Sequence, residues 1–265
     1  MKLGSLFMIY SFFALLGCQA KRPAMTPEAS VQFLYQTQSI SLGPLKNKTW
    51  QSFTQVDGIS GAQLSYGGYS IEALIQLARS QWNFRGKAIR FTARDGYVVN
   101  YSLDDLLKAR AFLALEVAGT STKGIYNPEL KTHFDWRPGY LVFRDSKMSA
   151  GKSSPYQIIS LELLDQTPTQ EFLAKVPDHL KNGAKVYLKT CNKCHSYQGL
   201  GGSKAPPINF MTIKRKNNSD LKRFLRAPQD VAKRRFEMSP FTGSDQDLDK
   251  LLKFLRSLEP KPANP

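Results

Sequence analysis

The sequence predicts a two-domain protein in which an N-terminal α+β domain is followed by an all-α domain. Three observations lead to this prediction. The chain has 265 residues, which is more than one average domain needs. The alternating apolar spacing of strands is frequent up to about residue 165, and helical apolar spacing replaces it further on. The proline-containing stretch DQTPTQEFLAKVPDH separates the two patterns.

The first domain is expected to occupy residues 49–165. Ser70 precedes apolar residues at helical spacing, which predicts a capped helix. The segment KAIRFTARDGYVVNYS alternates apolar and polar residues and breaks at Asp95 and Gly96, which predicts a β-hairpin. A second capped helix is predicted to begin after Ser102. Two more strands, GYLVFRD and YQIISLELL, complete this domain.

The second domain is expected to be entirely helical. A linker is predicted at residues 166–178, the helical domain at 179–258 and a flexible tail at 259–265. One helix is predicted to lead into Cys191, another to cover SDLKRFLRA, and a last one to begin at the cap Ser244.

The N-terminus has the pattern of an export signal. Lys2 is followed by an apolar run that is too short to span a bilayer. The run ends in Leu-Leu-Gly-Cys18, which resembles the lipobox of bacterial lipoproteins. The resemblance implies a signal peptide at residues 1–17, acylation of Cys18 and a lipidated tether at residues 18–48. The protein is then expected on the periplasmic side of the inner or outer membrane of a bacterium. The alternative is that Cys18 is only an apolar residue within a signal peptide.

The chain is strongly basic, with a formal net charge of +16 and a pI near 9.8. Residues 175–265 carry 19 Lys and Arg against 8 Asp and Glu, so the excess is concentrated in the second domain. Such a charge favours an acidic partner: a protein, an anionic membrane or a nucleic acid. An exported protein does not meet nucleic acid, so the expected partner is an acidic protein or lipid.

A cysteine pair followed by histidine, Cys191-Asn-Lys-Cys194-His195, lies in the second domain. A pair with this spacing can form a redox disulfide, bind zinc or hold a haem. A redox pair should follow a strand in a βαβ unit, and no such pattern flanks this one. Zinc needs two more ligands, and the only other histidines are His133 and His179. The motif is that of c-type haem, in which two thiols form thioethers with the porphyrin and the histidine ligates the iron.

The stretch from about Leu180 to Leu258 resembles the class I cytochromes c. Gly183, Tyr187 and Cys191 reproduce that family's glycine–aromatic–cysteine spacing on its first helix. The resemblance implies one covalent haem c in an all-α class I cytochrome fold. It also implies that a glycine at this position lets the last helix cross closely.

The same resemblance implies two further site residues. Pro207 lies twelve residues after His195, where the family's proline offers its carbonyl oxygen to the ligand histidine. Met238, in EMSPF before the last helix, is implied as the second axial ligand of the iron. Met211 is the competitor, but it lies only sixteen residues past His195 and lacks the Pro-Phe context, and its other interpretation is a core packing residue.

An iron with histidine and methionine ligands has no open position, which suits electron transfer rather than catalysis. The protein is therefore expected to be an electron carrier rather than an enzyme, with an acidic redox protein or a respiratory complex as its partner. Lys193 and the cluster Lys233, Arg234 and Arg235 are the candidate docking charges, although Lys193 is equally interpreted as an ordinary surface lysine.

The first domain resembles the molybdopterin-binding domain of sulfite-oxidase-type oxidoreductases. The resemblance rests on GKAIRFTARDGYVVNYSLDDLLKARAFLALE and on PYQIISLELL. That family binds molybdenum through a cysteine thiolate, but no cysteine lies between Cys18 and Cys191. Molybdopterin is therefore not expected, and a degenerate docking or dimerising domain is. The alternative is an oxidoreductase whose first domain binds a pterin or another substrate and passes electrons to the haem. The residues suggested to line such a site are His133, Asp135, Trp136 and Arg137, and structural packing is the other interpretation of them.

Overall fold

The computed structural model describes most of the chain between the two termini. It describes residues 30–42, 49–128, 131–145, 147–148, 152–208, 213, 217–232 and 238–258. The predicted signal peptide, Cys18 and the tail at 259–265 lie outside these ranges. None of the helices within them is long and apolar enough to cross a bilayer.

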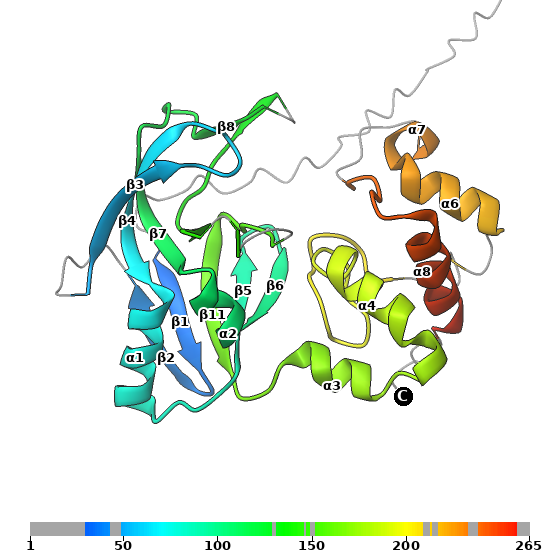
Figure 1. Ribbon diagram of the computed structural model, residues 1–265, viewed down its shortest axis with the longest axis horizontal. Helices are drawn as coiled ribbons and strands as arrows, with labels where there is room; N and C mark the ends of the chain where they lie inside the picture. The colour runs from blue at the N-terminus through cyan, green and yellow to red at the C-terminus, as the bar shows by residue number, and fades with distance from the viewer. Residues whose placement is uncertain are drawn as a thin grey trace, which may run out of the picture.

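Residues 31–164 form a mostly β domain (Figure 1). One sheet has five strands in the order β2-β1-β11-β5-β6, a second has four in the order β10-β7-β4-β3, and β8 and β9 form a separate ribbon. The helices of this domain are α1 (Ile71–Trp82) and α2 (Leu103–Lys108). The strands are β1 (Val31–Tyr35), β2 (Gln38–Leu42), β3 (Gln51–Val56), β4 (Gln63–Ser70), β5 (Ala88–Ala93), β6 (Val98–Ser102), β7 (Ala111–Ala118), β8 (Ile125–Asn127), β9 (Thr132–Phe134), β10 (Tyr140–Phe143) and β11 (Ile158–Leu164).

Local signals account for the start of both helices and for the hairpin. Ser70 Oγ accepts a hydrogen bond from the Ala73 amide, and Ser102 Oγ accepts one from the Asp105 amide, each at 3.1 Å. Both bonds satisfy amides that lack a partner inside the helix. Between β5 and β6 the chain turns at Gly96, whose φ of +84° is one that glycine adopts without strain. The predicted helices and hairpin are confirmed here.

The predicted tether is wrong for its second half. Residues 31–42 form β1 and β2, and β1 lies in the five-stranded sheet between β2 and β11. Val31 and Phe33 are fully buried there, on the face that packs against the main apolar core. Val31 and Phe33 lie on the same face because side chains alternate along a strand, and burial of their apolar surface favours this placement. The first domain therefore begins near residue 31 rather than at 49.

A buried carboxylate organises the β3–β4 turn. Asp57 is 1% exposed and accepts hydrogen bonds from the hydroxyls of Tyr66 and Tyr140, each at 2.8 Å. The Ser60 amide donates a third bond at 2.7 Å. A buried charge is tolerated only when it is hydrogen-bonded in this way. The two tyrosines come from β4 and β10, so this cluster joins strands across the second sheet.

The predicted linker is partly helical. Residues 166–178 include α3 (Pro168–Ala174), which connects the two halves of the molecule in Figure 1. Pro168 occupies the first turn of α3, where the missing amide of proline breaks no intrahelical bond. A proline that suggested a boundary thus begins a helix.

The C-terminal half is helical, as predicted. The helix α4 crosses the last helix, α8, at Gly183, where an added Cβ would lie 2.1 Å from the Lys250 carbonyl oxygen. Tyr187 is fully buried, and its ring centroid lies 5.6 Å from that of Phe254 on α8. The close crossing expected at Gly183 is therefore present. The elements are η1 (Asp178–Leu180), α4 (Lys181–Thr190), α6 (Asn218–Arg226), α7 (Pro228–Ala232) and α8 (Asp245–Ser257).

Candidate functional site

The cysteine–histidine motif forms a tight turn directly after α4. The Cys191 carbonyl oxygen accepts hydrogen bonds from the amides of Cys194 at 3.2 Å and His195 at 3.0 Å. Cys191 and Cys194 are both free thiols. The turn therefore holds two thiols and one imidazole within five consecutive residues.

The loop that follows the motif folds back onto it. The Ala205 amide donates to the Cys194 carbonyl at 3.0 Å, and the Gly202 amide donates to the Asn192 carbonyl at 2.8 Å. Gly201 has a φ of +113°, and a Cβ there would lie 2.5 Å from the His195 carbonyl oxygen. Only glycine combines this conformation with this approach. The GLGG sequence thus allows the loop to close over the motif.

The orientation of His195 is fixed by a backbone carbonyl. Its Nδ1 lies 2.7 Å from the carbonyl oxygen of Pro206. A carbonyl can only accept, so Nδ1 carries the hydrogen and Nε2 keeps the lone pair that a metal ligand needs.

The expectation that Pro207 supplies this carbonyl is wrong by one residue. The backbone of His195 forms a parallel β-bridge with that of Ala205. This bridge places the next residue, Pro206, against the imidazole. In a Pro-Pro doublet, residue spacing alone does not distinguish the two carbonyls.

Both thiols are more easily kept neutral than an exposed cysteine. Burial raises the pKa of Cys191 to about 11 and also raises that of Cys194, against which the Lys204 charge acts. Reactive redox cysteines need the opposite shift. In the described part of the chain no group of three or more His, Cys, Asp and Glu side chains is placed to hold a metal ion. Two neutral sulfurs and one imidazole lone pair fit a thioether-linked haem, because a thioether carries no charge to desolvate.

Comparison with known families identifies the segment that holds this turn. The family model described as cytochrome c matches residues 180–259. Residues 180–259 are a cytochrome c domain. Such a domain implies covalently bound haem c and a role in electron transfer. A comparison with curated proteins gave no match.

The segment before α8 is anchored to the core of the cytochrome c domain. Met238 is half-buried and packs on the same apolar cluster as Cys191. The Phe241 amide donates to the Leu225 carbonyl at 2.8 Å, and the Arg226 guanidinium donates to the Phe241 carbonyl at 2.8 Å. The segment that carries Met238 is thus anchored to the core of the domain, and the role of Met238 as an iron ligand stays a prediction. Met211 and the cluster Lys233, Arg234 and Arg235 lie outside the described residues.

The β5–β6 hairpin of the first domain contacts the haem-attachment turn, as Figure 1 shows for the loop after α4. The Val98 amide donates to the Lys193 carbonyl, and the Ser203 amide donates to the Gly96 carbonyl, each at 2.9 Å. Lys204 and Asp95 form an ion pair across the same contact. The sequence indicated the hairpin but carried no signal for its partner, which lies about one hundred residues further along the chain.

Lys193 is engaged within the chain. Its Nζ donates to Ser153 Oγ at 2.5 Å, and burial lowers its pKa. An ammonium held against the first domain is poorly placed to meet a partner protein. The contact with Ser153 favours the interpretation of Lys193 as a structural residue, and its role in docking stays a prediction.

The polar-aromatic residues suggested to line a pterin site are largely occupied with packing. Trp136 is 8% exposed in an apolar cluster, and Arg137 forms an ion pair with Asp135 at 2.8 Å. The exposed His133 ring lies 5.1 Å from that of Tyr126. These contacts agree with the packing interpretation.

Proposed function

We propose that the chain is a membrane-anchored monohaem c-type cytochrome that transfers electrons on the periplasmic side of a bacterial membrane. Cys191 and Cys194 would hold the haem, with His195 and Met238 as axial ligands of the iron. The observation that carries this proposal is the bond between His195 Nδ1 and the Pro206 carbonyl beside two free thiols. It prepares Nε2 as a ligand in a segment that matches the cytochrome c family.

The ligand set supports electron transfer as the function. When bound, the haem supplies a one-electron couple, and a thioether ligand favours its reduced state. Met238 and Tyr187 belong to one apolar cluster, which suits a redox centre that does not react with water. Because His195 and Met238 would fill both axial positions, no open position is left for a substrate.

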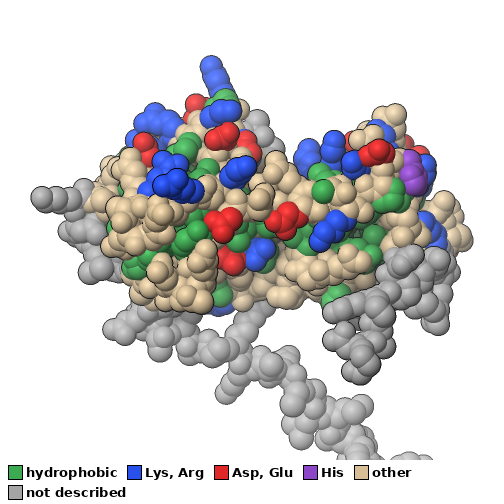
Figure 2. Space-filling view, turned by 90° about the horizontal axis from the view of Figure 1, so that it is seen from below, with side chains coloured by type: hydrophobic (Ala, Val, Ile, Leu, Met, Phe, Trp, Pro, Cys, Tyr) green, Lys and Arg blue, Asp and Glu red, His purple; other side chains and the backbone are tan. Residues whose placement is uncertain are grey.

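The first domain is proposed to act as a bracket that fixes the orientation of the cytochrome c domain. Two backbone hydrogen bonds, one ion pair and the Lys193–Ser153 bond support this role. The acidic partner must then dock on surface that the bracket leaves free. Figure 2 shows basic side chains on both halves of one face, interspersed with acidic ones. Exposed charges around a docking site mainly increase the rate at which two partner proteins associate.

Metal content tests the proposal directly. Protein matured in a host that supplies both haem and molybdopterin should contain one iron and no molybdenum per chain, as measured by elemental analysis. The haem should remain attached after denaturation, because thioethers are covalent. Stoichiometric molybdenum would favour the alternative, an oxidoreductase whose first domain carries out the chemistry. Absence of covalent haem would refute the proposed function.

The membrane anchor has its own test. Cys18→Ser should release the protein from membranes into the soluble periplasmic fraction, because the acylated thiol is lost. Cys194→Ser is the matched control, since it removes a thiol without touching the anchor. A Cys18→Ser protein that remains with the membrane fraction would show that the lipobox interpretation is wrong.

A further inference from the structure

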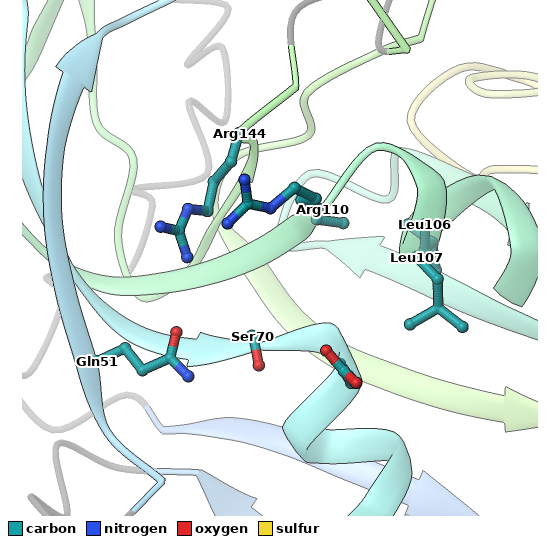
Figure 3. A pocket seen from close by; sticks show the side chains of 8 residues that line it. Gln51, Ser70, Leu106, Leu107, Arg110 and Arg144 are labelled. Carbon is teal, nitrogen blue, oxygen red and sulfur yellow. The ribbon is translucent and has the colours of Figure 1, made fainter.

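A second candidate site lies in the first domain, formed by residues that the proposed function does not use. A cavity of about 240 Å³ opens where the start of β3, the start of α1 and the turn after α2 meet. In Figure 3 the side chains of Arg110 and Arg144 lie alongside one another on one side of it, with Gln51 and Ser70 on the other.

The Arg110 and Arg144 side chains both line this cavity. No carboxylate among the described residues forms an ion pair with Arg110 or Arg144, and neither side chain donates a hydrogen bond to a described residue. Burial lowers the pKa of Arg144, and the charge of Arg110 lowers it further. Two like charges held together carry an electrostatic cost that a bound anion would remove.

The backbone and an aromatic ring hold this arrangement in place. The Arg144 amide donates to the Arg110 carbonyl at 3.4 Å, and the Arg144 guanidinium lies 4.5 Å above the centre of the Phe53 ring. Stacking occupies the face of the guanidinium and leaves its N–H edge free to bind. Arg110 itself has a φ of +50°, a conformation that costs free energy for any residue with a side chain. Strain beside unpaired charge is typical of a binding site.

The remaining groups define the class of ligand. Gln51 offers an amide, and Ser70 keeps a hydroxyl hydrogen because its oxygen already caps α1. Two planar N–H forks match the oxygens of a tetrahedral oxyanion, and two positive charges match a dianion. Glu72 also lines the cavity, so an anion must sit on the arginine side. With the anion in that position, the Glu72 carboxylate can accept a hydrogen bond from a hydroxyl group on the organic part of the ligand.

We propose that this cavity binds a phosphate monoester with a hydroxylated organic part, through Arg110 and Arg144. Such a group occurs in small soluble metabolites and also as the headgroup of phosphatidic acid. The shared chemistry is the terminal phosphate dianion.

Calorimetric titration of the haem-loaded full-length Cys18→Ser protein with glycerol phosphate tests the proposal. Arg110→Gln and Arg144→Gln should each weaken binding about tenfold or more, because each removes charge-assisted hydrogen bonds. Arg85→Gln is the control, since Arg85 is exposed and lies outside the cavity. Affinity should rise as the pH passes the second phosphate pKa, which is about 6. If one variant does not fold, the proposal is tested by the other variant and by the change in the chemical shift of Arg144 Nε when glycerol phosphate is added to the parent protein.

Flotation with phosphatidylcholine vesicles that contain phosphatidic acid distinguishes the two sources. Binding that Arg110→Gln and Arg144→Gln abolish and Arg85→Gln preserves would identify the lipid headgroup. Binding of glycerol phosphate without binding to these vesicles would identify a soluble ligand. The proposal is overturned if glycerol phosphate does not bind at millimolar concentration. It is equally overturned if all three variants bind alike, since the interaction would then follow only the net charge.

Discussion

The Lys204 ammonium lies 2.7 Å from the Asp95 carboxylate and joins the cytochrome c domain to the tip of the β5–β6 hairpin. Burial opposes the charge of Lys204, but the Asp95 carboxylate raises the pKa of this lysine above its ordinary value. Both side chains are partly exposed, so the pair alone contributes little, about 0.2–1 kcal/mol. The two backbone hydrogen bonds beside it fix the position of the hairpin.

Substitution of Gly96 should separate the two domains. A Cβ at Gly96 would lie 2.8 Å from the Lys204 amide nitrogen, so Gly96→Ala cannot keep the contact. X-ray scattering should show a larger radius of gyration, and residues 166–178 should be cut faster by protease. Gly61→Ala is the matched control, because Gly61 also has a positive φ, +68°, but nothing within 4 Å of an added Cβ. Equal radii for the two variants would refute a bracket held by this hairpin.

Met238→Ala should change the haem spectrum and the reduction potential. Loss of the thioether ligand should convert a six-coordinate low-spin iron to a high-spin or water-ligated one and lower the potential. Met148→Ala is the control, since Met148 is 42% exposed and lies in the first domain. An unchanged spectrum would mean that Met211 or another group ligates the iron.

Gly183→Ala should destabilise the cytochrome c domain. Alanine favours a helix by about 1 kcal/mol over glycine, but the added Cβ would lie 2.1 Å from the Lys250 carbonyl and 2.7 Å from Phe254 Cβ. The clash with backbone outweighs the gain, and we expect a net loss of about 1–2 kcal/mol. Thermal unfolding, followed by the absorbance of the haem, measures this loss of stability. Gly58→Ala, where the added Cβ meets nothing within 4 Å, should leave the melting temperature nearly unchanged.

The tyrosines around Asp57 predict alkaline unfolding of the first domain. Burial, followed by the charge of Asp57, raises the pKa of Tyr66 and of Tyr140 far above the ordinary 10.0. A raised folded-state pKa contributes stability that is complete below about pH 10 and is lost as the pH rises beyond it, because the unfolded chain releases the proton first. The urea concentration at the midpoint of unfolding should therefore fall as the pH rises above about 10.

The slope of the free energy of unfolding against pH is set by the number of protons released on unfolding. Tyr140→Phe should reduce that number by about one, since one titrating group is lost. The exposed Tyr126 provides the control, and Tyr126→Phe should leave the slope unchanged. A slope that does not differ between the two variants would contradict a role for the Asp57 cluster in alkaline unfolding.

Local patterns predicted the parts of this protein that local forces determine. The caps at Ser70, Ser102 and Ser244 and the hairpin turn at Gly96 follow from a few neighbouring residues, whereas the close crossing at Gly183 was expected only from the resemblance to a known family. The cysteine–histidine turn belongs to the same group.

Features that depend on distant partners were missed. The strand β1 pairs with β11, which lies about 130 residues away, and a five-residue segment alone gives no sign of such a partner. Pairing of Gly96 with Ser203 requires the two domains to meet, which no periodicity encodes. Pro206 was mistaken for its neighbour because register depends on the closed loop rather than on spacing.

The position of β1 also limits how far the protein can extend from a membrane. Only twelve residues, 19–30, lie between Cys18 and the first strand of the sheet. Twelve residues span at most about 40 Å. If Cys18 is acylated as proposed, Val31 stays within about 40 Å of the membrane surface, and the haem is held in a layer next to that membrane. A freely diffusing donor would have to come to that surface.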